Sequence, residues 1–240
     1  MTRRAFGVSF GPGMYALSMA VANGAPLKKV PTATGIDALF VPFVVAAEAK
    51  HFALRGHAQV KLVESADLTD EVAVVKLYDG VPRLWASIHL VGGFAMAPVA
   101  ETKKSDLMAQ LDMNFVTAFL CCRAAVNAMA RTGEGGRIVN VAARPALEWR
   151  GGAGMVAYAA SKAAVAALTV ALAEEVVKAG ILVNAVAPSI LDTPANRAAM
   201  PKADHAAWPK VAEVAATICF LASPMNKVTR GAVVPVYGRA

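Results

Sequence analysis

The chain has 240 residues, of which 57% are hydrophobic, and it carries a formal net charge of +7. This length suits one α/β domain, and this composition provides a large core and excludes an intrinsically disordered chain. The basic residues are scattered and are not interleaved with aromatic residues, so an anionic small ligand is a better partner than nucleic acid.

The first part of the chain holds a glycine pattern, Gly7, Gly11 and Gly13, and the stretch after it predicts a helix over 15–24. Glycines before a helix let backbone N–H groups approach a pyrophosphate, so we predict a dinucleotide-binding loop. A glycine-rich loop with no special role is the alternative. The glycines also interrupt the apolar stretch, which argues against a secretory signal. The apolar run 39–47 is too short to span a bilayer, so no membrane segment is predicted.

Helix-like and strand-like segments alternate in the C-terminal two-thirds of the chain. The predicted helices cover 106–130, 155–180 with a glycine C-cap at Gly180, and 211–223, and the predicted strands cover 136–143, 181–189 and 231–238. This alternation predicts parallel βαβ units, and hence an α/β fold with a mostly parallel, doubly wound Rossmann sheet and helices on both faces. No linker or repeat is visible, so we predict one domain over 1–240. Residues 81–89 lack the apolar pattern of a buried strand.

Tyr158 and Lys162 are four residues apart in the sequence YAASK, within the predicted helix 155–180. This spacing places both side chains on one helix face, where an ammonium group would stabilise a phenolate and lower the pKa of the tyrosine. Such a tyrosine exchanges a proton with a substrate, and such a lysine also binds ribose hydroxyls. Two surface residues on an alanine-rich helix are the alternative interpretation.

Asn114 lies on the apolar face of the predicted helix 106–130. A buried amide without partners costs about 1–3 kcal/mol, so Asn114 is either a satisfied core residue or part of a site. The cysteines are Cys121, Cys122 and Cys219, which have no metal-ligand spacing. They predict no metal site and fit a reducing, cytoplasmic compartment.

Taken in order, these segments resemble the short-chain dehydrogenase/reductase family over nearly the whole chain. The resemblance implies an NAD(P)-dependent oxidoreductase in which the catalytic residues are Tyr158, Lys162 and Asn114. The ADLTD and PSILDT segments and the glycine pattern match family segments that bind the cofactor. HLVG resembles a further such segment, with Gly92 retained and the two asparagines of the family absent. The implied cofactor-binding residues are Gly7, Gly11, Gly13, Asp67, Leu68, Gly92, Lys162, Pro188, Ile190 and Thr193.

One departure from the family is Ala143, which stands in the segment IVNVAARP where most members have a serine that donates to the reacting carbonyl oxygen. Loss of such a donor costs about 10²–10³ in rate, or roughly 3–4 kcal/mol. Ser161 and Ser189 are candidates for a substitute donor.

A narrower resemblance is to the dihydropteridine reductases and related bacterial oxidoreductases, which also lack the serine. It rests on the segments GGFAM, VAARPALEWRGGAGMVAYAASKAA and LDTPANRAAMPKADHAAW. The resemblance implies reduction of a conjugated small molecule such as a quinonoid dihydropterin, which accepts hydride with little polarisation of a carbonyl. The alternatives are an ordinary carbonyl reductase with a substitute donor and a non-catalytic nucleotide-binding sensor.

The choice between NAD and NADP depends on the atypical region before residue 90. Asp37 follows Gly13 by 24 residues and would favour NAD, whereas Lys28 and Lys29 would suit a 2′-phosphate, so we lean slightly to NAD. The family resemblance also implies a homodimer or homotetramer, formed through helices 106–130 and 155–179. Trp149, Met155 and Trp208 are candidate pocket walls, with ordinary packing as the alternative.

Overall fold

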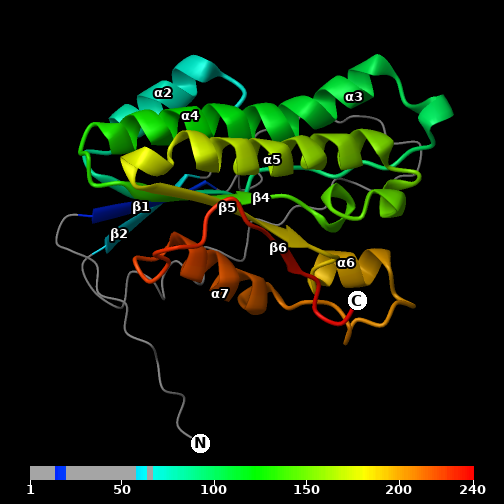
Figure 1. Ribbon diagram of the computed structural model, residues 1–240. Helices are drawn as coiled ribbons and strands as arrows, with labels where there is room; N and C mark the ends of the chain where they lie inside the picture. Colours follow the sequence, from blue (N-terminus) through cyan, green and yellow to red (C-terminus); the bar gives the residue numbers. More distant parts are fainter. Residues whose placement is uncertain (1–13, 20–57, 64–66) are drawn as a thin grey trace, which may run out of the picture.

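The computed structural model describes residues 14–19, 58–63 and 67–240. A six-stranded parallel sheet lies at its centre (Figure 1). The strand order is β2-β1-β3-β4-β5-β6, and every neighbouring pair is parallel. The strands are β1 Met14–Met19, β2 Ala58–Val63, β3 Leu84–His89, β4 Gly136–Val141, β5 Ile181–Pro188 and β6 Val233–Val236. The predicted α/β fold with a parallel Rossmann-type sheet is therefore confirmed.

The parallel register brings the carboxyl ends of the strands to one edge of the sheet. His89 of β3 lies opposite Asn140 of β4, and Val141 of β4 lies opposite Val186 of β5. The strand order reverses between β1 and β3, where doubly wound sheets bind ligands beyond the carboxyl ends of their strands. The segments that follow β3, β4 and β5 consequently meet at the edge where a site is expected.

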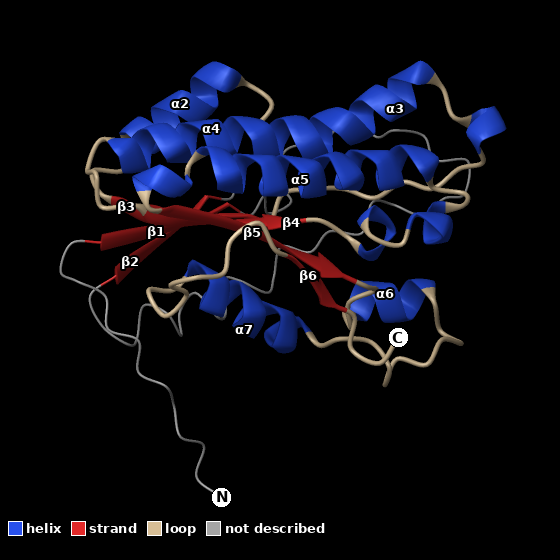
Figure 2. Cartoon of the chain, viewed as in Figure 1, coloured by secondary structure: helices blue, strands red, loops and turns tan. Residues whose placement is uncertain are grey.

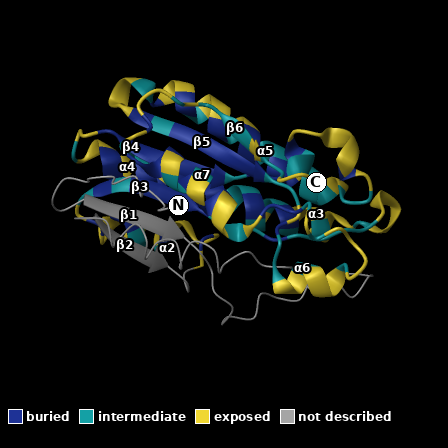
Figure 3. Ribbon diagram, turned by 90° about the horizontal axis from the view of Figure 1, so that it is seen from below, coloured by how far each residue is buried: buried dark blue, intermediate teal, exposed yellow. Residues whose placement is uncertain are grey.

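Helices cover both faces of the sheet (Figures 1 and 2). On one face lie α2 Glu71–Asp79, α3 Lys104–Leu111, α4 Thr117–Ala130 and α5 Val156–Glu175. On the other face lie α6 Pro194–Ala199 and α7 Val211–Ala222. Figure 3 shows the buried residues of β4 and β5 between these layers. Parallel strands that are covered on both faces are mostly apolar along their length. This pattern allowed β4 and β5 to be predicted from the sequence.

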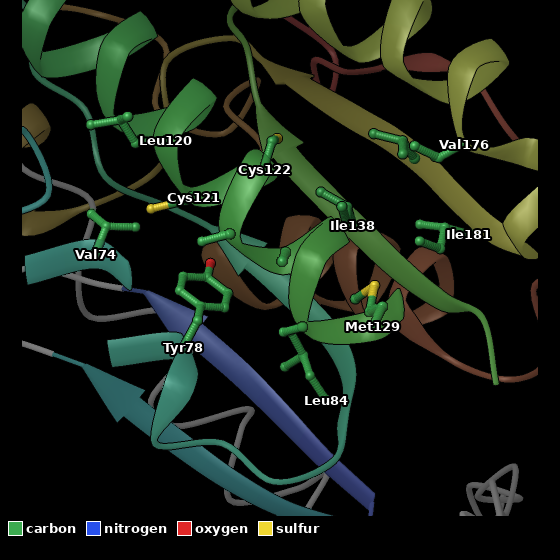
Figure 4. Packing of buried hydrophobic residues seen from close by; sticks show 14 of the residues in the cluster. Val74, Tyr78, Leu84, Leu120, Cys121, Cys122, Met129, Ile138, Val176 and Ile181 are labelled. Carbon is green, nitrogen blue, oxygen red and sulfur yellow. The ribbon is translucent and has the colours of Figure 1, made fainter. Parts of the chain in front are cut away.

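Among the described residues, two main hydrophobic clusters hold the layers together. The larger one joins α2 and α4 to the sheet, and the smaller one joins α7 to the opposite face. Figure 4 shows Tyr78 of α2 within the larger core, with its hydroxyl directed toward α4. Tyr78 is 1% exposed, and its hydroxyl lies 2.8 Å from the Ser87 hydroxyl of β3. A polar group is therefore paired beneath helix α2 instead of being left unsatisfied in the core.

Two predictions for the first ninety residues are wrong. Residues 84–89 form strand β3, although they lack a simple apolar pattern, because the polar side chains of Ser87 and His89 pair inside the core. The predicted helix over 15–24 is also wrong, because Met14–Met19 is a strand that pairs with both β2 and β3. Pairing on both sides of a strand overrides a weak local helix preference.

Two predicted helices are correct in place but not continuous. The segment 104–130 contains a π-helical turn at Asp112–Val116, between α3 and α4. Helix α5 ends at Glu175, and a 3₁₀ turn, Val177–Ala179, leads to Gly180, whose φ of 73° suits glycine. Residues 104–130 and 156–175 are long and apolar enough to cross a membrane, a test that the core helices of soluble domains also pass, and here both pack in the helix layer.

Candidate active site

Asn114 lies in the π-helical turn between α3 and α4 and is 1% exposed. Its Oδ1 accepts from the Gly93 N–H at 2.9 Å, and its Nδ2 donates to the Gly93 carbonyl at 3.0 Å. The same Nδ2 also donates to the Ser161 hydroxyl of α5 at 3.0 Å. The Asn114 amide thus uses both of its hydrogens to connect the segment after β3 with helix α5.

Tyr158 and Lys162 lie one turn apart on α5, as predicted. Lys162 is 5% exposed, and its ammonium group donates to the Val141 carbonyl at the end of β4 over 2.9 Å. Tyr158 is half-buried, and the Phe94 ring approaches its ring edge-on with centroids 4.9 Å apart. Both side chains therefore reach the segments that leave β3 and β4.

Gly92 and Gly93 allow the chain after β3 to pass close to these side chains. A Cβ on Gly92 would lie 2.6 Å from Asn114 Oδ1 and 2.9 Å from Lys162 Nζ. A Cβ on Gly93 would lie 1.8 Å from the sulfur of Met113. The predicted site residue Gly92 is thus brought directly against two other predicted site residues, and a larger side chain there would displace them.

Burial changes the pKa values of both helix α5 side chains. It raises the pKa of Tyr158 to about 12 and lowers the pKa of Lys162 to about 8. Both shifts follow from removal of the charged form from water. The prediction that Lys162 lowers the pKa of Tyr158 is therefore wrong for the protein without ligand. The Lys162 ammonium donates to Val141 O, and burial outweighs any effect of its charge on the phenol.

Ala143 lies just after β4, is 4% exposed and begins a 3₁₀ turn at Arg144–Ala146. The Ser161 hydroxyl is fully buried and donates to the Tyr158 carbonyl at 2.8 Å. The Ser189 hydroxyl donates to the Tyr237 carbonyl at 2.9 Å. The hydroxyl hydrogens of both candidate substitutes are thus already donated to backbone carbonyls.

The other predicted cofactor-binding residues within the described part of the chain lie at two places. Pro188 ends β5, Ile190 is 43% exposed, and the Thr193 hydroxyl caps helix α6 by accepting from Asn196 N. Asp67 and Leu68 precede α2, with Leu68 buried and the Asp67 carboxylate accepting from the backbone and the hydroxyl of Thr69. Their contacts with a cofactor stay a prediction.

Gly7, Gly11 and Gly13 lie outside the described residues, as do Asp37, Lys28 and Lys29. In a Rossmann fold the phosphate-binding glycines follow the first strand. Here strand β1 begins at Met14 and so follows the glycines in the chain. Their predicted role stays a prediction, without the helix that was expected after them.

Trp149 lines a hollow of about 480 Å³ together with Val156, Ala159 and Ala163. At 100° per residue, these helix α5 positions point away from the face that bears Tyr158 and Lys162. The hollow is therefore separate from the Tyr158 site, and Trp149 is no wall of that site. Trp208 is 7% exposed and packs against the His205 ring, which agrees with ordinary packing.

Phe94 and His89 are the residues near the site that sequence reasoning missed or misjudged. Phe94 belongs to the segment GGFAM, in which two glycines before an aromatic residue could have indicated a ring held close to the backbone. His89 lies in residues 81–89, which lack the apolar pattern of a buried strand and so gave no signal of a role. Its buried contacts to Ser87 and Asn140 depend on strand pairing, which no local pattern contains.

Comparison with known proteins agrees with the fold. A family model described as short chain dehydrogenase matches residues 39–204. The cis-4-hydroxycyclohexanecarboxylate dehydrogenase of Sinomonas cyclohexanicum is 33% identical over 201 residues, which cover 78% of this chain and 79% of that protein. A reductase of Mycobacterium tuberculosis, named for a hydroxy-methyl-oxo-hexahydroindene-carboxyl-CoA, is 34% identical, with 71% and 69% covered.

A third relative, the (2S)-[(R)-hydroxy(phenyl)methyl]succinyl-CoA dehydrogenase subunit BbsD of Thauera aromatica, is 34% identical. That match covers 62% of this chain and 60% of the relative's own length. None of these three is a dihydropteridine reductase, so the narrower resemblance stays a prediction.

Solved structures show the same fold. The acetoin dehydrogenase of Enterobacter cloacae is 28% identical, with a TM-score of 0.66 over 79% of this chain and 77% of that one. A structure described as ElxO with NADP bound has a TM-score of 0.75 and 20% identity, with 93% and 97% covered.

Proposed function

This chain belongs to the short-chain dehydrogenase family, and we propose that Tyr158, Lys162 and Asn114 form its active site for NAD(P)-dependent reduction of a small molecule. The observation that carries the proposal is their convergence. Asn114 bonds to Gly93, Lys162 bonds to Val141, and Gly92 passes between the two side chains at the carboxyl edge of the sheet. This edge is where doubly wound sheets bind their ligands.

Lys162 has the features expected of a residue that binds a ribose. Its ammonium group carries three hydrogens, and among the described residues only the Val141 carbonyl accepts one of them. A buried cation with unused donors is costly unless a ligand completes its shell. Ribose hydroxyl oxygens of a nicotinamide nucleotide fit that need, and the bound nucleotide would supply the hydride.

Tyr158 would act as the acid. Its hydroxyl makes no hydrogen bond with the described residues, and its raised pKa keeps the proton on the phenol oxygen at neutral pH. A protonated tyrosine suits reduction, in which the substrate oxygen or nitrogen gains a proton. Asn114 would hold Gly93 and Ser161 in place, and a role in positioning a relay water is a further expectation.

Ala143 supports a conjugated substrate, such as a quinonoid dihydropterin or a quinone. Neither Ser161 nor Ser189 is free to replace the missing donor, since both hydroxyls donate to backbone carbonyls. A conjugated acceptor that takes hydride readily needs less polarisation than a simple ketone. The Phe94 ring beside Tyr158 would pack against a flat, unsaturated ring.

Two other functions remain to be distinguished. The relatives named above are dehydrogenases and reductases of hydroxy and oxo compounds, which favours an ordinary carbonyl reductase. A nucleotide-binding sensor without catalysis is the second alternative, favoured by the missing serine at Ala143. Both NAD and NADP are candidates. The slight lean to NAD rests on Asp37, outside the described residues.

The test follows oxidation of NADH and of NADPH with three acceptors: quinonoid dihydropterin, a simple quinone and a simple ketone. We expect turnover with the first two and little with the ketone. Tyr158→Phe should lower kcat by about 10²–10⁴ while NADH or NADPH still binds, since it removes only the acid. Binding without turnover of any acceptor would favour the sensor, and fast ketone reduction would favour the carbonyl reductase.

We further propose that the protein forms a homodimer or homotetramer through the outer surfaces of α4 and α5. These surfaces carry exposed apolar side chains, including Phe119, Val156 and Val170, and an alanine-rich stripe that allows close packing. Sedimentation equilibrium tests this proposal. Ala160→Glu and Ala167→Glu should each give a monomer, whereas a chain that is already monomeric without substitution would contradict it.

A further inference from the structure

A buried chain of polar side chains runs through the larger core, from α2 across β3 and β4 to α5. Its members are Tyr78, Ser87, His89, Cys122, Asn140 and Thr169, each at most 4% exposed. The His89 ring is central to it, with Nε2 lying 2.8 Å from the Ser87 hydroxyl and Nδ1 lying 2.8 Å from Asn140 Oδ1. Neither resemblance stated above nor the proposed catalytic residues account for this arrangement.

The hydrogen bonds at the α5 end fix the protonation of His89. The Thr169 hydroxyl donates to the Val165 carbonyl, so it accepts from Asn140 Nδ2 at 3.0 Å. Asn140 therefore presents its oxygen to His89, and only a hydrogen on Nδ1 satisfies that contact. With the imidazole neutral, Nε2 accepts from the hydroxyl of Ser87 or Tyr78.

The α5 end of this chain is tied to the proposed active site. Thr169 lies seven residues after Lys162, which is two helical turns, so both side chains face strand β4. Asn140 and Val141 are consecutive in β4, and they bind Thr169 and Lys162 respectively. Helix α5 is thus attached to β4 by two hydrogen bonds, Thr169–Asn140 and Lys162–Val141. His89 contacts the Asn140 side chain that makes the first of them.

We propose that His89 is a positioning residue for Lys162. Its Nδ1–H orients the Asn140 amide, the amide holds Thr169, and this contact keeps α5 in the position from which Lys162 reaches Val141 and the cofactor. The inference rests on the proposed role of Lys162 in cofactor binding. The opposite branch, through Ser87 and Tyr78 to α2, leads away from α5 and should serve stability alone.

The surroundings of His89 keep its ring neutral. Tyr78 of α2, Cys121 and Cys122 of α4, Ser87 of β3, Asn140 of β4 and Thr169 of α5 line this network, and none of them is a carboxylate. A proton added to the ring would remain without a counter-charge, and burial lowers the pKa of His89 to about 4. The Nδ1–H form therefore persists across the pH range in which the enzyme would be assayed.

Two variants at the ends of the network provide the first test. Thr169→Val keeps the shape of the side chain and removes the hydroxyl on the α5 branch, whereas Ser87→Ala removes the hydroxyl on the α2 branch. Both positions are fully buried, so both variants should lower the melting temperature. We expect only Thr169→Val to weaken binding of NADH and NADPH, by roughly 3- to 30-fold, as measured by fluorescence titration.

Two variants at His89 itself provide the second test. Asparagine places a donor near the position of Nδ1, and glutamine reaches only to the position of Nε2. His89→Asn should keep the parental dissociation constant and the parental pH profile of kcat/KM. His89→Gln should weaken nucleotide binding as Thr169→Val does and shift the apparent pKa of the profile.

Equal losses of nucleotide affinity in Thr169→Val and Ser87→Ala would overturn the inference, because a purely structural role predicts no difference between branches. So would unchanged affinity in both His89→Gln and Thr169→Val. Lys162→Met separates this failure from failure of the proposed function. If Lys162→Met itself leaves nucleotide binding unchanged, the proposed active site is wrong. If it abolishes binding and the network variants do not, only the role of His89 is wrong.

Discussion

Two buried cations lie at opposite ends of strand β4, and they differ in how many protein groups bind them. Arg137, near the start of the strand, is 8% exposed, and Lys162, beside its end, is 5% exposed. The guanidinium of Arg137 is held by several protein groups, whereas the Lys162 ammonium has one acceptor among the described residues. The difference separates a cation used for structure from a cation available to a ligand.

Arg137 is held from three directions. Its Nε and Nη2 both donate to the Asn226 carbonyl, at 3.0 and 2.6 Å, and its Nη1 donates to the Gly136 carbonyl. The guanidinium also lies 4.8 Å from the centre of the Trp85 ring. Such a shell compensates a buried charge, and it connects β4 to the segment after α7.

The buried charge of Lys162 loses its contact with water and gains one hydrogen bond from the described residues in return. Burial lowers its pKa to about 8, and no described carboxylate pairs with it. Proteins carry such unfavourable groups where a ligand needs them, at the expense of stability. The comparison therefore predicts opposite consequences for removal of the two charges.

The largest expected effect is on nucleotide binding by Lys162→Met. Loss of two charge-assisted hydrogen bonds to the ligand should weaken NADH or NADPH binding about a hundredfold or more and abolish turnover. Isothermal titration calorimetry measures the binding, and Lys104→Met, at an exposed lysine of α3, is the matched control. Parental affinity in Lys162→Met would contradict the distinction between the two cations.

Arg137→Met should lower the stability of the fold and leave nucleotide affinity unchanged. Removal of the guanidinium leaves the buried carbonyls of Asn226 and Gly136 without these donors, which should cost about 2–4 kcal/mol of unfolding free energy. Urea denaturation measures this loss, and nucleotide affinity should remain parental in the folded variant. A stability within about 0.5 kcal/mol of the parent would show that the charge is not structural.

The pH dependence of stability gives a third, somewhat smaller effect. The pKa of Lys162 is about 8 in the folded chain against 10.5 for an ordinary lysine, so the unfolded state alone is protonated between these values. Unfolding free energy contributed by this group should therefore rise with pH from about 8 to about 10.5, by up to about 3 kcal/mol. The difference between the wild type and Lys162→Met, measured in urea, should follow that rise and stay constant below pH 8.

The smallest effect is expected for Trp85→Phe. This change keeps an aromatic face beneath Arg137 and removes the indole N–H that donates to the Ala222 carbonyl at 3.0 Å. One hydrogen bond of this kind is worth about 1 kcal/mol. A loss of more than about 2 kcal/mol in urea denaturation would mean that the indole has another role.

The sequence predicted the part of the fold in which local patterns and tertiary structure agree. Strands β4 and β5 are short, largely apolar segments that follow glycines, and α5 is an unbroken alanine-rich segment, so each was predicted in place. The four-residue spacing of Tyr158 and Lys162 placed both on one face of that helix. Asn114 was predicted from its apolar neighbours, and its contact with Gly93 follows from the parallel sheet.

Other features depended on contacts that no local pattern contains. Strand β3 was missed because Ser87 and His89 are buried together with partners from β4 and α2. The turn at Asp112–Val116 changes the helix hydrogen bonds without a signal in composition. The pKa values of Tyr158 and Lys162 depend on burial by the whole fold, so the expected lowering for Tyr158 was wrong.

The central claim is that Lys162 is kept buried, charged and incompletely bonded for a ligand. Urea denaturation of Lys162→Met and of the wild type at pH 7, without nucleotide, tests it most directly. The account predicts that the variant is more stable, by about 1–3 kcal/mol, because a costly charge has been removed. A variant less stable than the wild type would contradict the account, since it would show that Lys162 stabilises the fold as Arg137 does.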